Sequence, residues 1–196
     1  KQLTTHKTTS LSPRWSPDGS RLAYTSYKGA NAWLYILDVG SGASKPISRQ
    51  AGLNISAAWA PDGKTLALTL SKDGNSELYL IRDNGDIIKR LTNNFWIDVS
   101  PSWSPSGERI AFVSAKSGTP QIYVMDKEGN NIARLTYAGT HNEPPAWSPR
   151  GDLIAFAGRD EGYFDVFIMN VDGSQIRRLT TLDSANEEHP TWSPDG

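Results

Sequence analysis

Histidine and carboxylate side chains are the residue types in this sequence that can do acid–base or metal chemistry, and they meet at two places. The chain has three histidines, His6, His141 and His189. His141 stands in THNEPP two residues before Glu143, and His189 directly follows Glu188 in NEEHP. An imidazole beside a carboxylate can move a proton or hold a metal ion. Two histidines without a repeated third ligand do not make a metal site, so we expect no metal and no cofactor.

A nucleophile for covalent catalysis is missing from the sequence. The chain has no cysteine, which excludes thiolate nucleophiles, thiolate metal sites and disulfides. No G-x-S-x-G segment occurs, so the sequence lacks the strand–turn–helix elbow that carries the serine of an α/β-hydrolase. We therefore expect a protein that is not an enzyme.

The composition argues against two further classes of protein. The formal net charge is −1 and no basic cluster occurs, which argues against nucleic acid as the main partner. No run approaches the about 18 apolar residues of a membrane-spanning helix. We expect no transmembrane segment, and a protein or a peptide as the partner.

One pentapeptide recurs along the chain and sets its organisation. It reads WSPDG, WAPDG, WSPSG, WSPRG and WSPDG, and its tryptophans are Trp15, Trp59, Trp103, Trp147 and Trp192. The spacing is 44 residues three times and then 45. Proline follows each tryptophan by two positions and glycine by four. Proline fixes φ and glycine allows positive φ, so the pentapeptide predicts the same tight turn in every repeat.

Short apolar runs follow each turn. They read RLAYTS, TLALTL, RIAFVS and LIAFAG, then WLYILD, ELYLIR, QIYVMD and DVFIMN, then KPIS, KRLT, ARLT and RRLT. These runs are rich in β-branched and aromatic residues and are bounded by turn residues, which predicts strands. With the strand at each tryptophan, a repeat holds four strands. A tandem period near 44 residues therefore predicts an all-β fold, a β-propeller of four-stranded blades in which the tryptophans are packing residues.

The repeats begin and end out of phase with the chain. Leu3 precedes Trp15 by 12 residues, as Ile47 precedes Trp59, so KQLTT is expected to be the last strand of a blade. HPTWSPDG is expected to be the first strand of another. We expect residues 1–196 to form one propeller fragment, with four complete blades and a partial blade at each end. The complete blades are expected to begin near Trp15, Trp59, Trp103 and Trp147, and the last partial blade near Trp192.

These repeats resemble those of a known family. PRWSPDGSRLAYTS and PSWSPSGERIAFVSAKSG are similar to the WD40-like PD40 repeat of TolB-type propellers, and the resemblance covers essentially the whole chain. It implies a six-bladed propeller preceded by a small α/β domain, located in the periplasm. It also implies a non-catalytic role in the Tol–Pal envelope system, where the propeller binds the lipoprotein Pal. We expect this sequence to depart from that pattern, with fewer blades and without the preceding domain.

The loops that could recognise a partner can be placed from strand direction. Antiparallel strands alternate in direction, so the fourth-to-first and second-to-third connections of a blade emerge on one face. The repeats differ most in these loops, and variable loops on a rigid scaffold are where binding specificity usually lies. We expect contacts at the channel mouth from Asp98, His141, Asn142, Glu143, Glu187, Glu188 and His189. We expect a basic rim on the same face from Lys28, Lys72, Lys116 and Arg159, and Trp96 is a candidate anchor.

Three functions remain open on the sequence. The first is docking of a Pal-like lipoprotein or a peptide on the loop face. The second is a propeller that gates a prolyl-oligopeptidase-type serine peptidase, since the same repeat occurs there. The third is a lone PD40 propeller with an unknown ligand. The repeat encodes the scaffold and not the partner, so it does not separate them.

Overall fold

The computed structural model describes every residue except 1, 5–7, 29–30, 161 and 182–183. The described residues form strands and no helix. In chain order the strands are β1 (Ser10–Trp15), β2 (Arg21–Lys28), β3 (Asn31–Asp38), β4 (Ser44–Ser48), β5 (Asn54–Trp59), β6 (Thr65–Leu70), β7 (Glu77–Arg82), β8 (Ile87–Arg90), β9 (Asp98–Trp103), β10 (Arg109–Ser114), β11 (Gln121–Asp126), β12 (Ala133–Arg134), β13 (His141–Trp147), β14 (Leu153–Arg159), β15 (Asp165–Asn170) and β16 (Arg177–Arg178). The described residues contain no helix with the length and apolarity that a membrane crossing requires.

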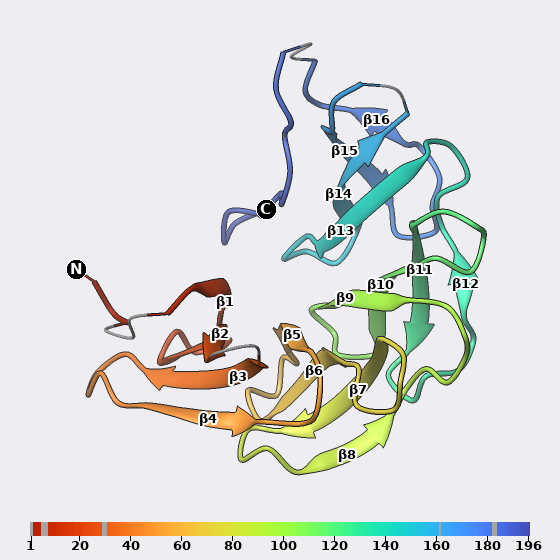
Figure 1. Ribbon diagram of the computed structural model, residues 1–196. Coiled ribbons are helices and arrows are strands. Elements are labelled where there is room, and N and C mark those ends of the chain that lie inside the picture. Colours follow the sequence, from red (N-terminus) through yellow and green to blue (C-terminus); the bar gives the residue numbers. More distant parts are fainter. Residues whose placement is uncertain (1, 5–7, 29–30, 161, 182–183) are drawn as a thin grey trace. The chain divides into compact units, whose positions relative to one another are not determined.

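The strands form four sheets of four strands each. Within each sheet, strands that follow one another along the chain are neighbours and run antiparallel (Figure 1). Each sheet is therefore a blade made of one sequence repeat. The first strand of every blade ends on a tryptophan of the pentapeptide. The predicted all-β fold with four complete blades is confirmed.

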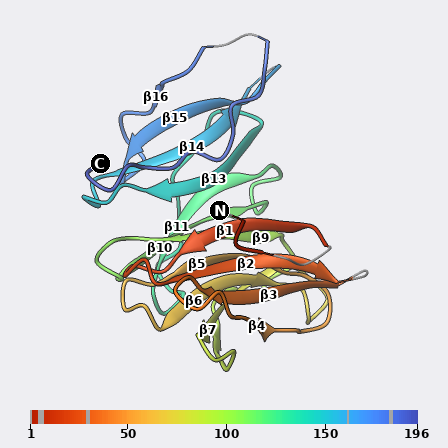
Figure 2. The same ribbon diagram turned by 90° about the vertical axis from the view of Figure 1, so that its left-hand side faces the viewer.

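The chain divides into two compact units of two blades each, Lys1–Phe95 and Trp96–Gly196. In the first unit β5 packs against β1, β2 and β3, so the two sheets lie face against face (Figure 2). In the second unit β13 packs in the same way against β9, β10 and β11. Neighbouring blades within a unit thus share one hydrophobic interior.

The pentapeptide forms the turn that its proline and glycine predict. In the first repeat the backbone N–H of Gly19 donates to the oxygen of Ser16 at 2.9 Å, and Gly19 has φ of +70°. The carboxylate of Asp18 accepts hydrogen bonds from the backbone N–H and the hydroxyl of Ser20, at 3.1 and 2.8 Å. The proline and the glycine therefore fit the backbone geometry of the turn, and the hydrogen bonds of Asp18 stabilise it.

A bulge interrupts the first strand of the blades. Ser12, Ser56 and Ser100, three residues before a tryptophan, have φ of 53°, 53° and 55°. The pairing of β1 with β2 skips from Leu11 to Arg14 across this place. A bulge leaves the extra residue out of the ladder and re-aims its neighbours. The repeat pattern does not predict this bulge, because serine is not a residue type that marks left-handed backbone.

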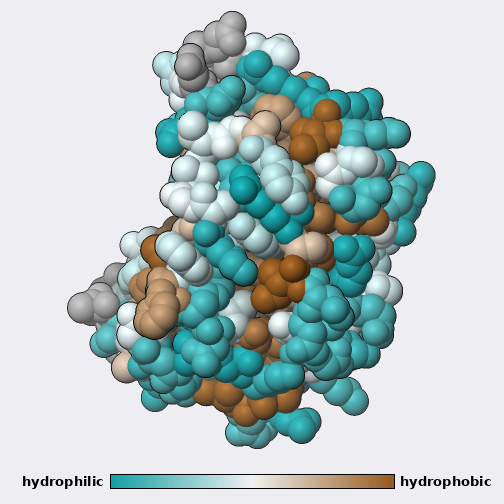
Figure 3. All heavy atoms as spheres, turned by 90° about the vertical axis from the view of Figure 1, so that its right-hand side faces the viewer, coloured by the Kyte–Doolittle hydropathy of each residue, from teal (hydrophilic) through white to brown (hydrophobic). Residues whose placement is uncertain are grey.

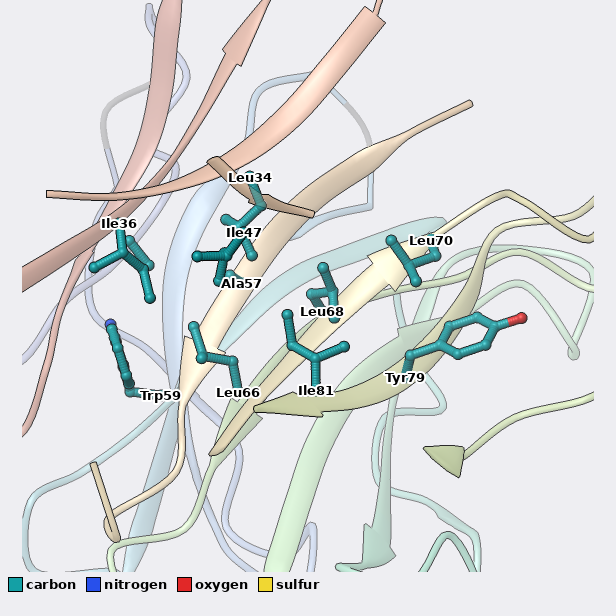
Figure 4. Packing of buried hydrophobic residues seen from close by; sticks show 11 residues of the cluster. Leu34, Ile36, Ile47, Ala57, Trp59, Leu66, Leu68, Leu70, Tyr79 and Ile81 are labelled. Atoms are coloured by element: carbon teal, nitrogen blue, oxygen red, sulfur yellow. The ribbon is translucent and has the colours of Figure 1, made fainter. Parts of the chain in front are cut away.

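Each unit has its own hydrophobic core. In the first unit, Leu66, Leu68 and Ile81 face Leu34 and Ala57 of the adjoining strands (Figure 4). In the second unit the core holds Ala111, Val113, Ile122, Val124, Leu135, Trp147, Ile154, Phe156 and Met169. The alanine eight residues after each tryptophan is buried in all four blades, at Ala23, Ala67, Ala111 and Ala155. Its small side chain lets neighbouring sheets approach.

Tryptophans of the pentapeptide contact the preceding blade within a unit, as Trp59 and Trp192 do. Trp59 and Trp147 are buried, and Nε1 of Trp59 donates to the backbone oxygen of Arg14 at 3.2 Å. Trp192 makes the equivalent bond to the oxygen of Ala146 at 2.9 Å. Trp15 is 57% exposed, because the described residues before it form no sheet that could cover it. The packing role predicted for the tryptophans is thus confirmed for Trp59 and Trp147.

The fourth strands form the least covered part of the blades. β12 and β16 are only two residues long. Ile87 and Ile88 within β8 are exposed, as are Ile132 before β12 and Ile176 before β16. The face in Figure 3 carries separate hydrophobic patches within a mainly hydrophilic surface.

Candidate functional site

The variable loops meet on one face of each blade. The backbone N–H of Ser71 donates to Leu53 O at 3.2 Å, which joins the second-to-third loop to the fourth-to-first loop. The N–H of Ala115 donates to Ile97 O at 3.0 Å in the next blade, and Thr140 N–H to Arg159 O at 2.8 Å in the fourth. The loop placement predicted from strand direction is confirmed within each blade.

On this face of the second unit lies a pocket of about 120 Å³. Its walls come from four separate segments, and its lining residues are Ser100, Glu143, Pro144, Phe164, Glu188 and His189. Three of the predicted contact residues, Glu143, Glu188 and His189, are thus brought together. Their side chains are 39%, 38% and 73% exposed, so a partner can reach them.

The histidines stand beside carboxylates, as their positions in the sequence suggested. Nε2 of His141 lies 2.8 Å from Oε1 of Glu143, without the alignment of a hydrogen bond. The His141 ring meets the ring of Phe164 edge to face, with centroids 5.3 Å apart. Nδ1 of His189 lies 3.9 Å from Oε2 of Glu188. The pocket therefore combines acceptor oxygens with an aromatic wall, which suits a partner that brings N–H donors or a cationic side chain.

The segment after β16 is tied to the pocket through its backbone. The N–H of Glu187 donates to Phe164 O at 2.8 Å, and the N–H of Phe164 donates to Oδ1 of Asn186 at 3.1 Å. One carboxylate oxygen of Glu187 is buried and accepts no hydrogen bond within the described part of the chain. A buried polar atom without a partner is uncommon in a native protein. Glu187 directly precedes Glu188 of the pocket lining but does not itself line the pocket.

Two of the predicted contact residues are buried instead. Asp98 and Asn142 are 1% and 3% exposed, at the first or second residue of the first strand of their blade. Nδ2 of Asn142 donates to the backbone oxygen of Ala138 at 2.8 Å, just as Nδ2 of Asn54 donates to Gln50 O at 2.9 Å. This position fastens the preceding loop. Asp98 and Asn142 are buried in this structure, and the Asn142 amide is turned into its own loop. Their contact with a partner stays a prediction.

The residues of the predicted basic rim differ in their exposure and in their contacts. Lys116 is exposed, whereas Lys72 lies half-buried, with Nζ 2.8 Å from Asp73 and 5.2 Å from the ring centre of Tyr79. The guanidinium of Arg159 stacks over Phe164 at 4.8 Å, so it belongs to the wall behind the pocket. The side chain of Lys28 lies outside the described residues.

Three lining residues were missed in the sequence analysis. Ser100 lies at the bulge of β9, Pro144 lies in β13, and Phe164 precedes β15. The one available signal was the serine repeated three positions before Trp15, Trp59 and Trp103. Phe164 breaks the repeat and carries no local signal. In the described part of the chain, no three His, Asp or Glu side chains are arranged to hold a metal ion.

Comparisons with known proteins find relatives in one family. The sequence model of the TolB beta propeller domain, PD40, matches residues 1–196. Tol-Pal system protein TolB of Xanthomonas campestris pv. campestris is 48% identical over 44 residues, which are 22% of this chain and 10% of that protein. The crystal structure of TolB from Acinetobacter baumannii superposes with a TM-score of 0.83 at 32% identity, over 93% of this chain and 47% of that one. The chain thus spans about half the length of that TolB.

A likeness to a peptidase propeller is also present. The crystal structure of puromycin hydrolase superposes with a TM-score of 0.68 at 17% identity, over 89% of this chain and 30% of that one. At this identity the likeness shows the fold alone.

Proposed function

The chain belongs to the TolB β-propeller family, and on that premise we propose that it is a non-catalytic, protein-binding propeller of the periplasm. Its partner is a Pal-like lipoprotein or a peptide of the Tol–Pal envelope system, docked on the variable-loop face. The observation that carries the proposal is the pocket that gathers Glu143, Glu188 and His189 on that face.

The pocket has the composition of a docking site. Protein interfaces commonly combine an apolar centre with a polar rim that exchanges hydrogen bonds. Phe164 supplies the apolar wall, with Arg159 and His141 stacked on its ring. Glu143 and Glu188 supply exposed acceptors at the rim. Lysine, arginine and backbone N–H groups of a partner would find complementary charge there.

The same pocket gives little support to catalysis. Serine, histidine and glutamate all line it, as Ser100, His189 and Glu188. A nucleophile must lie within hydrogen-bond reach of its base. No hydrogen bond joins Ser100 to a histidine among the described residues. The rival function, a propeller that gates a serine peptidase, rests on fold likeness alone. A parent sequence that continues into a domain with G-x-S-x-G would favour that rival.

Charge reversal in the pocket tests the proposal. Glu143→Lys should weaken binding of the soluble domain of a Pal-like lipoprotein from the same organism at least tenfold, about 1.4 kcal/mol. The measurement is isothermal titration calorimetry on the full-length protein, with the thermal midpoint checked so that unfolding is not mistaken for lost binding.

Glu108→Lys provides the matched control. Glu108 carries the same charge, is 65% exposed, and lies in the turn on the opposite face, paired with Lys127. Its reversal should leave affinity unchanged. Equal effects of the two variants would refute the site, and absence of any binding by the wild-type protein would refute the Pal-like partner.

A further inference from the structure

A second pocket lies between the two blades of the second unit, apart from the docking pocket. It has a volume of about 170 Å³ and is lined by residues of the loop 136–139 and of strands β13, β14 and β15. Its floor is the stacked pair Phe156 and Phe167, whose rings are 5.5 Å apart and inclined by 15°. Arg159, Asp160 and Ile176 also line it.

Beside this pocket the fourth blade has a glycine where the second blade has a leucine. Asn54 pairs with Leu70 across the first two strands of the second blade, and Asn142 pairs with Gly158 at the same place in the fourth. Leu70 is fully buried in the core of the first unit. A Cβ on Gly158 would come within 2.7 Å of Asn142 Oδ1 and 3.0 Å of the Phe167 ring. Glycine at this place therefore lets the Asn142 amide oxygen and the Phe167 ring approach the backbone, where the second blade has a leucine side chain.

A free acceptor is turned towards Gly158 in the lining of the pocket. Nδ2 of Asn142 donates to Ala138 O at 2.8 Å and to Oε1 of Gln121 at 3.0 Å. These two acceptors fix the orientation of the amide, so Oδ1 faces Gly158. Asn142 is 3% exposed as a whole residue. No donor of the described residues bonds its Oδ1, which is not one of the fully buried atoms without a partner.

The second blade shows the same amide with its acceptor satisfied. Oδ1 of Asn54 accepts from the hydroxyl of Ser48 at 2.6 Å and from the N–H of Gln50 at 3.0 Å. Thr136 precedes Asn142 by six residues, as Ser48 precedes Asn54. The Thr136 hydroxyl, however, donates to Oε1 of Gln121 at 2.8 Å and not to the asparagine. Asn142 thus keeps a free acceptor where Asn54 has none.

We propose that this pocket binds a phenol ring, as presented by a tyrosine side chain of a polypeptide or by a free phenolic compound. The volume suits one six-membered ring, since an engineered apolar cavity of about 150 Å³ binds benzene. Phe156 and Phe167 offer aromatic contact to the ring. The phenol hydroxyl donates to Asn142 Oδ1, which gives this acceptor a partner. The proposal does not depend on the function proposed above.

The test compares two probes that differ only in the hydroxyl, p-cresol and toluene. Each is titrated into the ¹⁵N-labelled 196-residue chain and followed by ¹H–¹⁵N NMR. p-Cresol should shift the Asn142 side-chain amide and the Gly158 and Gly139 backbone signals saturably, and toluene should bind at least tenfold more weakly. Equal affinity of the two probes, or no saturable shift at these signals, would overturn the proposal.

A pair of variants tests whether p-cresol binds in this pocket or elsewhere on the protein. Ile176→Trp narrows the pocket from its partly exposed edge and should weaken p-cresol binding at least tenfold. Ile132→Trp makes the same change at the equivalent exposed isoleucine of the preceding repeat, which does not line the pocket, and should leave binding unchanged. Equal loss, or no loss, in both variants would contradict the assigned location.

Titration with N-acetyl-tyrosine amide distinguishes the two sources of the phenol ring, a tyrosine of a polypeptide and a free phenolic compound. Binding at least as tight as that of p-cresol would indicate a tyrosine of a polypeptide. Binding of p-cresol with exclusion of the amide would indicate a free phenolic compound.

Discussion

Single residues fix the backbone at places where the blade departs from a regular ladder. Ser12, Ser56 and Ser100 occupy the left-handed region at the bulge, although each has a side chain. Left-handed backbone costs an L-residue about 1–2 kcal/mol, and glycine avoids that cost. The repeated serine therefore keeps a strained backbone conformation. The resulting bend sets the direction of the last residues of the first strand.

Substitutions at Ser56 should expose this strain. Ser56→Gly should keep the free energy of unfolding within about 1 kcal/mol of wild type, because relief of strain offsets the freer unfolded chain. Ser56→Val should lose at least about 1 kcal/mol, because a β-branched residue resists positive φ. Urea unfolding followed by tryptophan fluorescence measures both. A valine variant as stable as the glycine variant would show that the bend is unstrained.

Turn aspartates should make stability depend on acid pH. Hydrogen bonds from Ser16 and Ser20 lower the pKa of Asp18 from 3.8 to about 2. A carboxyl with a lower pKa in the folded state stabilises that state above its unfolded pKa. This contribution is lost as the pH falls from about 4 towards about 2. Asp18→Asn should therefore flatten the fall in stability between pH 4 and pH 2.

Urea unfolding at several pH values between 2 and 5 measures the effect. Ser106 takes the place of Asp18 in the third repeat and does not titrate. Ser106→Ala should leave the pH dependence as in wild type. Parallel curves for Asp18→Asn and wild type would mean that the turn hydrogen bonds do not depend on the charge.

At the scale of elements, an arginine joins neighbouring blades within the first unit. Arg21, at the start of β2, donates to Oδ2 of Asp83 at 2.7 Å and to the backbone oxygen of Gly63 at 2.5 Å. Its guanidinium also stacks over Trp59 at 4.7 Å. Arg109 repeats the stack over Trp147, at 5.7 Å, in the second unit. The pentapeptide tryptophan is thus held by the blade before it.

Arg21→Lys should weaken this contact between the two blades while keeping the positive charge. The lysine loses the planar fork and the stacking, so we expect a loss of about 1 kcal/mol in the free energy of unfolding. The side chains of Arg21 and Asp83 are 25% and 34% exposed, which limits the contribution of the ion pair. Arg82→Lys, at an exposed position that ends β7, is the control and should change nothing. Equal stability of all three proteins in urea would contradict the role of Arg21.

At the scale of the whole molecule, the interior is divided between two units. Leu68 belongs to the core of the first unit and Ile122 to that of the second, and both are fully buried. Repeat proteins gain much of their stability from contacts between neighbouring repeats. Damage to one core should therefore be felt most strongly within its own unit.

Leu68→Ala should lower the free energy of opening in its own unit by about 2–5 kcal/mol. Hydrogen exchange followed by mass spectrometry should show β6 and β7 losing more protection than β10 and β11. Ile122→Ala should give the reverse pattern. Equal loss of protection in all four strands would show that the chain opens as a single cooperative unit.

The sequence by itself determined the blade. Its period, its turn residues and its alternating apolar runs are local features, and local backbone preferences with a period of two place strands and turns almost without tertiary information. The four blades, the buried alanines and the face of the variable loops followed from these patterns.

Only the tertiary structure decided which loop residues are available to a partner. Asp98 and Asn142 are polar like Glu143, and all three lie in the first strands of their blades. The first two are nevertheless buried, whereas the Glu143 side chain is 39% exposed. Phe164 and Gly158 break the repeat, and they shape the two pockets because of what lies across from them. Burial and side-chain direction depend on neighbours that are distant in the chain, and a repeat that encodes the scaffold does not encode those neighbours.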